Sequence, residues 1–265
     1  MLRVGLCQVT SSESPAENLG LIRARVAEAA AGGAKVVVFP EAAMARFGVS
    51  LQPLAEPLDG PWAKAVAGIA ADHDVLVVAG MFTPADDGRV RNTLLVTGLG
   101  ERLGYDKIHL YDAFGFRESD TVAPGGDPVT ITVGDTTLGF ATCYDIRFPE
   151  LFRALADQGA DAIVVPTSWG AGEGKLEQWE VLVRARALDS GCWVLGCGQA
   201  DPAATSIPVN PKAPTGIGYS TVADGFGAVR AQLGPGPEVL VVDVDPAVTA
   251  KARTATGALA NRRLG

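Results

Sequence analysis

Short runs of Val, Leu, Ile and Ala recur along the chain between more polar segments. The runs cover residues 2–9, 34–40, 74–82, 91–98, 137–143, 161–167, 192–198 and 238–245. Runs of this length with little alternation of polar residues predict buried β-strands. Helical periodicity lies between several of them, in residues 16–31, 61–72, 149–158 and 176–190. Strands that alternate with helices predict an α/β fold in which helices cover much of the sheet.

Local signals support two of these boundaries and mark one loop. Pro149 and Glu150 suit the first turn of a helix, and Gly159 suits its end before the next strand. Residues 199–218 are too rich in Pro, Ala and Gly for a strand or long helix, and we expect a surface loop that could form part of a pocket rim. We find no repeat or linker and expect one domain over residues 1–265.

Composition and charge narrow the functional classes. Of the 265 residues, 48% are hydrophobic and 20% charged, which is ordinary for a compact globular protein. The net charge of -8 opposes binding to nucleic acid or to an anionic membrane surface. The segment MLRVGLCQVTSSES holds no apolar stretch long enough for a signal peptide or a membrane span, so we expect a cytoplasmic protein.

Cysteine and histidine usage argues against disulfides and metals. The cysteines, at positions 7, 143, 192 and 197, are too sparse for a disulfide framework. The histidines, at positions 73 and 109, form no metal-binding spacing, so we expect neither a metal nor another cofactor. Cys7, Cys192 and Cys197 lie within apolar runs, where a packing role is the default.

Cys143 differs because it closes a predicted strand, and ligands commonly bind at the carboxyl ends of strands in α/β proteins. Position alone leaves nucleophile and buried small residue equally open. Glu41 also follows a predicted buried strand, where a charged group is costly unless it is paired. Lys107, in GYDKIHLYD, would by itself be read as a solvated surface lysine.

The motifs around these residues resemble those of the nitrilase superfamily of carbon–nitrogen hydrolases. They are FPEAAM, DKIHLYD, CYDIRFPELFRALADQGADAIVVPTSW and QWEVLVRARALDSGCWVLG. The resemblance covers nearly the whole chain and is greatest to the omega-amidase and deaminated-glutathione amidase branch. It implies a four-layer αββα sandwich that forms a homodimer or higher homo-oligomer through helices near the nucleophile. It also implies a catalytic triad of Glu41, Lys107 and Cys143, with Glu118 as a second glutamate.

Amide hydrolysis needs a nucleophile, a proton carrier and a positive group for the oxyanion. We expect Cys143 to attack, Glu41 to act as base, and Lys107 with the Tyr144 N–H to hold the oxyanion. The pKa values of an ordinary carboxylate and thiol differ by about 4 units, or roughly 5.7 kcal/mol. We expect burial to raise the pKa of Glu41, and the Lys107 charge with a helix N-terminus to lower that of Cys143.

The expected substrate is a small-molecule amide, most simply the terminal amide of a small carboxylic-acid amide. Arg147 and Arg46 are candidates to bind a substrate carboxylate, although a structural ion pair is an equal alternative for each. Tyr144 and Trp169 could line the pocket or pack in the core. The rival hypotheses are hydrolysis of a nitrile or an N-carbamoyl amide, a Cys–His hydrolase that uses His109, and a catalytically idle relative that works by binding.

Overall fold

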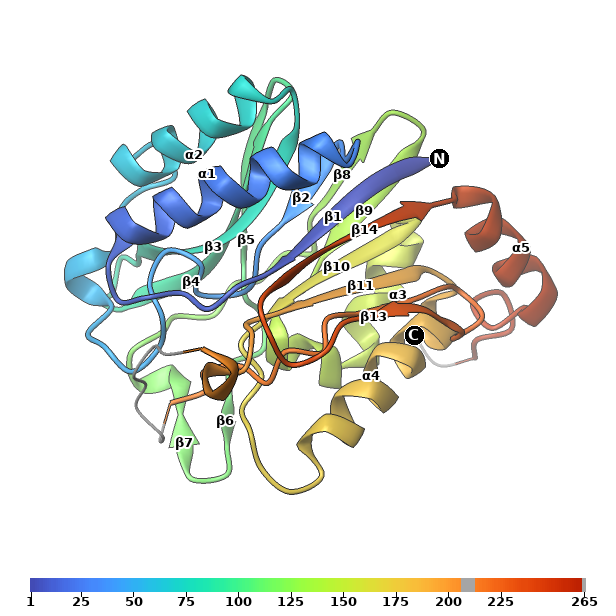
Figure 1. The fold of residues 1–265 in the computed structure, drawn as a ribbon. Helices are drawn as coiled ribbons and strands as arrows, with labels where there is room; N and C mark the ends of the chain where they lie inside the picture. Colours follow the sequence, from blue (N-terminus) through green and yellow to red (C-terminus); the bar gives the residue numbers. More distant parts are fainter. Residues whose placement is uncertain (206–212, 264–265) are drawn as a thin grey trace.

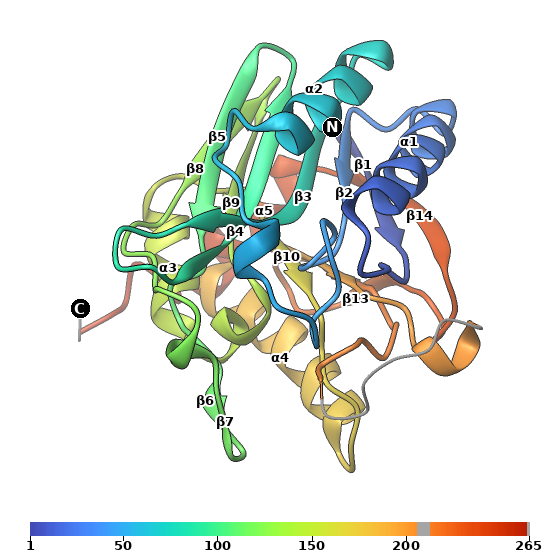
Figure 2. The same ribbon diagram turned by 90° about the vertical axis from the view of Figure 1, so that its left-hand side faces the viewer.

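Two six-stranded sheets stack face to face, and helices cover both outer faces (Figure 1). The computed structural model describes residues 1–205 and 213–263. Within them the chain forms the layers helix, sheet, sheet, helix, which confirms the expected αββα sandwich. The turned view in Figure 2 shows α1 and α2 on one side and α3 and α4 on the other.

The first sheet has the strand order β14-β1-β2-β3-β4-β5. Its strands are β1 (Leu2–Gln8), β2 (Val36–Val38), β3 (Leu76–Pro84), β4 (Val90–Gly98), β5 (Glu101–Asp106) and β14 (Glu238–Val244). Strands β1, β2 and β3 are parallel, whereas β14, β4 and β5 pair antiparallel with their neighbours. Parallel neighbours need a crossover connection, which α1 and α2 supply here.

The second sheet repeats this plan in the order β13-β12-β11-β10-β9-β8. Its strands are β8 (Thr130–Val133), β9 (Thr136–Phe140), β10 (Ala162–Thr167), β11 (Trp193–Gly198), β12 (Thr221–Ala223) and β13 (Val229–Gln232). Strands β9, β10 and β11 are parallel and are joined by crossovers that contain α3 and α4. A small separate hairpin consists of β6 (Asp112–Ala113) and β7 (Phe116–Arg117).

The helices begin with clear sequence signals. They are α1 (Pro15–Ala31), α2 (Pro61–Asp72), α3 (Pro149–Asp157), α4 (Lys175–Ser190) and α5 (Pro246–Thr256), with 3₁₀ helices η1 (Gln52–Leu54), η2 (Glu118–Asp120), η3 (Cys143–Arg147) and η4 (Pro202–Ala204). All α-helices in this set except α4 start with proline, whose fixed φ and missing N–H suit a first turn. The side chains of Ser14 and Asp245 cap α1 and α5. Among the residues described, none of the helices is both long and apolar enough to cross a membrane.

Apolar side chains fill the space between the two sheets. Val4, Val36 and Leu76 from the first sheet share one buried cluster with Phe140 and Val164 from the second. Both faces of each central strand are therefore covered, one by the opposite sheet and the other by helices. This explains why these strands have near-continuous apolar sequences.

Several elements lie outside the sequence expectation. The strands β5, β8, β12 and β13, the β6–β7 hairpin and helix α5 were not predicted. Strand β9 ends at Phe140, so Cys143 begins η3 instead of closing the strand. The expected loop at 199–218 contains η4, while its residues 206–212 lie outside the described part of the chain.

Candidate active site

The site lies where the carboxyl ends of central strands from both sheets meet. Glu41 follows β2 of the first sheet, and Ser168 follows β10 of the second. The turn after Glu41 passes close over β3: a Cβ at Gly80 would lie 2.5 Å from the backbone nitrogen of Ala42. Only glycine fits this approach without a backbone shift. The geometry of β3 therefore fixes where Glu41 enters the site.

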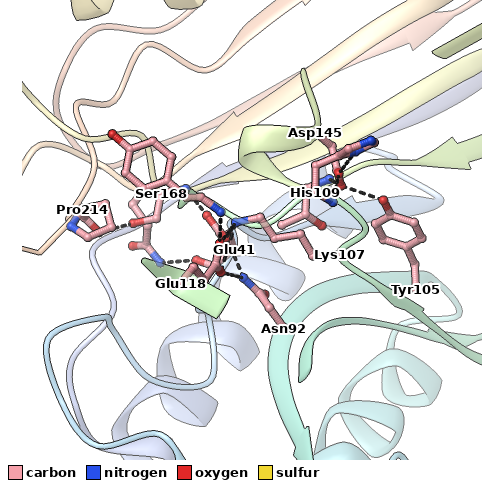
Figure 3. A network of polar contacts seen from close by, with 12 residues as sticks. Glu41, Asn92, Tyr105, Lys107, His109, Glu118, Asp145, Ser168 and Pro214 are labelled. Carbon is pink, nitrogen blue, oxygen red and sulfur yellow. Dashed lines mark hydrogen bonds and ion pairs between the residues drawn. The ribbon is translucent and has the colours of Figure 1, made fainter. Parts of the chain in front are cut away.

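The carboxylate of Glu41 is buried and accepts three hydrogen bonds. Its Oε1 lies 3.0 Å from Lys107 Nζ and 2.7 Å from Asn92 Nδ2, and its Oε2 accepts from the Ser168 N–H at 2.9 Å (Figure 3). Only 1% of Glu41 is exposed. Charge-assisted hydrogen bonds of this kind offset the cost of burying the carboxylate.

Glu118 binds the same ammonium from a second direction. Lys107 Nζ lies 2.9 and 3.2 Å from its two carboxylate oxygens, and the Tyr111 N–H donates to Oε2 at 2.7 Å. Lys107 is 2% exposed, so it is a buried ion-pair partner and not a solvated surface lysine. Burial alone would lower the pKa of Lys107, but the charges of Glu41 and Glu118 raise it well above its ordinary value. Lys107 is therefore charged at neutral pH.

Cys143 sits on a sharp backbone turn with φ of +47°. A non-glycine residue in this left-handed region is strained and must be held by its surroundings. The buried carboxylate of Asp145 holds it by accepting from the Thr142 N–H and the His109 N–H, each at 2.8 Å, and from the Tyr105 hydroxyl at 2.6 Å. Figure 3 shows Asp145 between Tyr105 and His109.

The protonation state of the thiol differs from the sequence expectation. Burial, followed by the charge of Glu41, raises the pKa of Cys143 well above its ordinary value. The positive charge of Lys107 lowers this pKa but does not outweigh the other two effects. The expectation for Lys107 therefore holds in direction, whereas the pKa of Cys143 lies above its ordinary value and not below it, so the resting residue is a thiol.

A cavity of about 100 Å³ is lined by Glu41, Lys107, Glu118 and Cys143. Of the candidate binding residues, it is lined by Tyr144, Arg147 and Trp169. Pro214 also lines it, so the described end of the expected rim loop does reach the pocket.

Arg46 is not part of this wall. Its Nη2 lies 3.3 Å from Glu13 Oε2, and it lines a separate, smaller cavity beside Ser168. Within the described ranges, no group of His, Cys, Asp and Glu side chains could hold a metal ion.

Three contributors to the site were missed in the sequence. Asn92 bonds Glu41, the Ser168 N–H bonds the same carboxylate, and Lys175 lines the cavity. Asn92 could have been found as a polar residue within the apolar run RNTLLV, because a buried amide must have partners. The other two contributors have no comparable signal in the sequence. One is the backbone N–H of Ser168, and the other is Lys175, the first residue of a helix after a glycine-rich turn.

Comparison with known proteins decides the family. The sequence profile described as carbon–nitrogen hydrolase matches residues 3–254. The chain belongs to the carbon–nitrogen hydrolase family. It is 51% identical to a protein of Mycobacterium tuberculosis described as a hydrolase, over 98% of this chain and 95% of that protein. This confirms the resemblance to the nitrilase superfamily.

Other members of the carbon–nitrogen hydrolase family are amidases by name. The deaminated glutathione amidase of Escherichia coli O157:H7 is 30% identical, over 93% of this chain and 92% of its own. The omega-amidase NIT2 of Danio rerio is 31% identical, over 92% and 88%. Among solved structures, Saccharomyces cerevisiae Nit3, of branch 10 of the nitrilase superfamily, has a TM-score of 0.84 and 26% identity, covering 99% of this chain and 97% of that one.

Proposed function

We propose that this carbon–nitrogen hydrolase cleaves the terminal amide of a small carboxylic-acid amide, through a thioester on Cys143 and with release of ammonia. The observation that carries the proposal is the shared cavity wall, in which Glu41 and Lys107 accompany the cysteine. The amidases among the relatives support the same reaction class.

The burial of Glu41 at this cavity and the raised pKa of Cys143 support Glu41 as the group that takes the thiol proton in the first step. As the sulfur of Cys143 bonds to the amide carbon, Glu41 takes the thiol proton. Lys107 and the Tyr144 N–H stabilise the oxyanion. Tyr144 lies in the first turn of η3, where N–H groups have no partner inside the helix. The carbon–nitrogen bond then breaks, and Glu41 returns the proton to the leaving ammonia.

The second step releases the acid. Glu41 takes a proton from water as the water oxygen bonds to the thioester carbon, the carbon–sulfur bond breaks, and the proton returns to the Cys143 thiol. In this scheme Glu118 orients Lys107, because both of its carboxylate oxygens lie within hydrogen-bond distance of the ammonium. Asn92 Nδ2 lies 2.7 Å from Glu41 and 3.4 Å from Glu118 and fixes the two carboxylates relative to each other.

The test is ammonia release from a panel of amides, an N-carbamoyl amino acid and a nitrile. We expect the wild type to hydrolyse a small amide and Cys143→Ala to release no ammonia. Cys7→Ala is the matched control, because Cys7 packs under α1 away from the cavity. Mass spectrometry during turnover should detect an acyl group on the wild-type protein but not on Cys143→Ala. Amide turnover by Cys143→Ala would exclude the scheme.

A further inference from the structure

Thr167, the last residue of β10, has a hydroxyl group that the proposed scheme does not use. The residue is 1% exposed, and its hydroxyl oxygen makes no hydrogen bond of ordinary geometry to any residue in the described part of the chain. The hydroxyl of the next residue, Ser168, donates to the Pro214 carbonyl at 2.6 Å. A buried hydroxyl without a partner costs free energy, so the hydroxyl of Thr167 needs an explanation.

The order of the strands indicates which way this hydroxyl faces. Thr167 pairs with Gly198 of β11, and a Cβ at Gly198 would lie 3.7 Å from the methyl carbon of Thr167. The methyl group is therefore on the β11 side of its strand. The neighbour on the other side is β9, which ends at Phe140, and the chain continues from there to Cys143. This arrangement leaves the hydroxyl to face the side on which Cys143 lies.

Cys143 also packs on the face of the sheet to which Thr167 points. Side chains alternate along a strand, so Ile163, Val165 and Thr167 share one face of β10. Cys143 packs against the buried cluster that contains Ile163 and Val165. Strand side and sheet face thus both place the hydroxyl next to the sulfur.

The charge of the sulfur decides how strongly this hydroxyl is bound. Burial and the charge of Glu41 raise the pKa of Cys143, whereas the charge of Lys107 and donation from the Thr167 hydroxyl lower it. A neutral thiol is a weak acceptor, and a hydrogen bond to an ionised acceptor is much stronger. The donor is therefore idle beside the resting thiol and gains its partner when the sulfur becomes negative. An interaction that is stronger in the transition state than in the resting state accelerates the reaction.

We propose that the Thr167 hydroxyl is a catalytic hydrogen-bond donor to the sulfur of Cys143. As Glu41 takes the thiol proton and the sulfur bonds to the amide carbon, the hydroxyl donates to the sulfur and keeps its own proton. It donates again when the carbon–sulfur bond of the thioester breaks and negative charge returns to the sulfur. Thr167 does not line the cavity, so it acts on the sulfur and not on the substrate. This inference rests on the proposed function and adds a donor for its nucleophile.

Thr167→Val tests the proposal by replacing the hydroxyl with a methyl group of similar size. We expect the rate at which iodoacetamide alkylates Cys143 at neutral pH to fall about ten- to 100-fold, the effect of losing a hydrogen bond to a charged group. The pH profile of alkylation should move to higher pH, and kcat for an amide should fall more than KM changes. Thr167→Ser, which keeps the hydroxyl, should retain most of both rates. Mass spectrometry of the peptide that contains Cys143 separates its alkylation from that of the other cysteines.

Thermal stability distinguishes this role from a structural one. Because the hydroxyl has no partner beside the resting thiol, Thr167→Val should leave the Tm unchanged or raise it. Thr249→Val is the matched control: Thr249 is also 1% exposed, but its hydroxyl donates to the Asp161 carbonyl at 2.8 Å, and it lies on α5 outside the cavity. This control should lower the Tm and leave the alkylation of Cys143 unchanged.

Failure of this inference differs from failure of the proposed function. If amides are hydrolysed and Thr167→Val equals the wild type in alkylation and kcat, the role of the hydroxyl is wrong while the amidase activity stands. If the wild type hydrolyses no amide, alkylation decides alone, because iodoacetamide reacts with the sulfur directly. Slower alkylation of Thr167→Val but not of Thr167→Ser supports the donor, and equal rates overturn it. A loss of Tm in Thr167→Val as large as that in Thr249→Val also overturns it, since the hydroxyl would then have a partner in the resting protein.

Discussion

At the scale of single residues, the central feature is one buried ammonium shared by two buried carboxylates. Glu41, Lys107 and Glu118 are each at most 5% exposed. Two carboxylates this close repel each other unless a cation lies between them. Lys107 therefore has a structural role as their counterion in addition to its proposed role at the oxyanion.

Replacing this ammonium should cost stability as well as activity. We expect Lys107→Met to lower the free energy of unfolding by about 3–5 kcal/mol, the usual effect of leaving buried charges without their partner. Urea denaturation followed by circular dichroism measures this, with Lys64→Met, at an exposed position on α2, as control. A loss equal to that of Lys64→Met would contradict the counterion role.

The pH dependence of that loss follows from the raised pKa of Lys107. A group whose pKa is raised on folding contributes its full stability below its unfolded pKa and loses it as the pH rises through the folded pKa. The stability difference between wild type and Lys107→Met should therefore stay constant across neutral pH. It should shrink in strongly alkaline solution, as Lys107 loses its proton.

Sequence motifs identify the proposed catalytic residues but not the charges and burial that set their pKa values. Glu41 and Cys143 were found because each follows an apolar run and matches a family motif. The direction of the Cys143 pKa shift could not be predicted, since it depends on how the folded chain surrounds the sulfur and on the carboxylate of Glu41 beside it. Lys175 was missed because a lysine in a glycine-rich turn gives no sign of the rings around it.

At the scale of elements, the turn into η3 determines how Cys143, the proposed nucleophile, is presented to the cavity. Strand β9 ends at Phe140, and η3 begins at Cys143, so the strand gives way to a 3₁₀ helix within a few residues. Asp145 holds this turn by accepting hydrogen bonds from the Thr142 N–H, the His109 N–H and the Tyr105 hydroxyl. A single buried carboxylate thus connects η3 to the end of β5 and the segment after it.

Asp145→Asn tests this clamp. An amide offers only one acceptor oxygen and places an NH₂ group against existing donors, so at least one buried N–H loses its partner, at about 1–3 kcal/mol. We expect a lower free energy of unfolding, a lower kcat and slower alkylation of Cys143 by iodoacetamide. Asp86→Asn, at an exposed position, is the control. Unchanged alkylation and kcat would show that the turn needs no such support.

Elements with a continuous apolar sequence could be predicted from the sequence. Elements at the edge of a sheet, or with few buried residues, could not. The central strands β1, β3, β10 and β11 are covered on both faces and were found from their Val and Leu content. The edge strand β13 is mostly exposed and has no comparable pattern. Helix α5 was missed because only Thr249 and Ala252 are buried in it, although Asp245 and Pro246 mark its start.

At the scale of the whole molecule, buried glutamines tie the two sheets together beside the site. Gln199, which follows β11, accepts from the Ser11 N–H at 3.0 Å and donates to the Glu41 carbonyl at 3.0 Å. Gln8 at the end of β1 accepts from the Ser220 N–H at 2.9 Å. These contacts join residues far apart in sequence and set the distance between the halves that carry Glu41 and Cys143.

Gln199→Leu tests whether the hydrogen bonds of Gln199 align the site without being needed for the sheets to form. Leucine has a similar size but leaves the Ser11 N–H and the Glu41 carbonyl without their partner. We expect a reduced kcat with an unchanged far-ultraviolet circular dichroism spectrum. Gln158→Leu, at an exposed position after α3, controls for the change of residue type. A kcat equal to that of this control would mean that the apolar core alone aligns the halves.

The division of the site between the two sheets also has a consequence for how the chain folds. Glu41 follows a strand of the first sheet, whereas η3 and Ser168 follow strands of the second. A folding intermediate with only one sheet formed would have the secondary structure of that sheet, but the proposed nucleophile and base would not yet lie together. Recovery of activity during refolding therefore reports the docking of the two sheets, and not the formation of either layer.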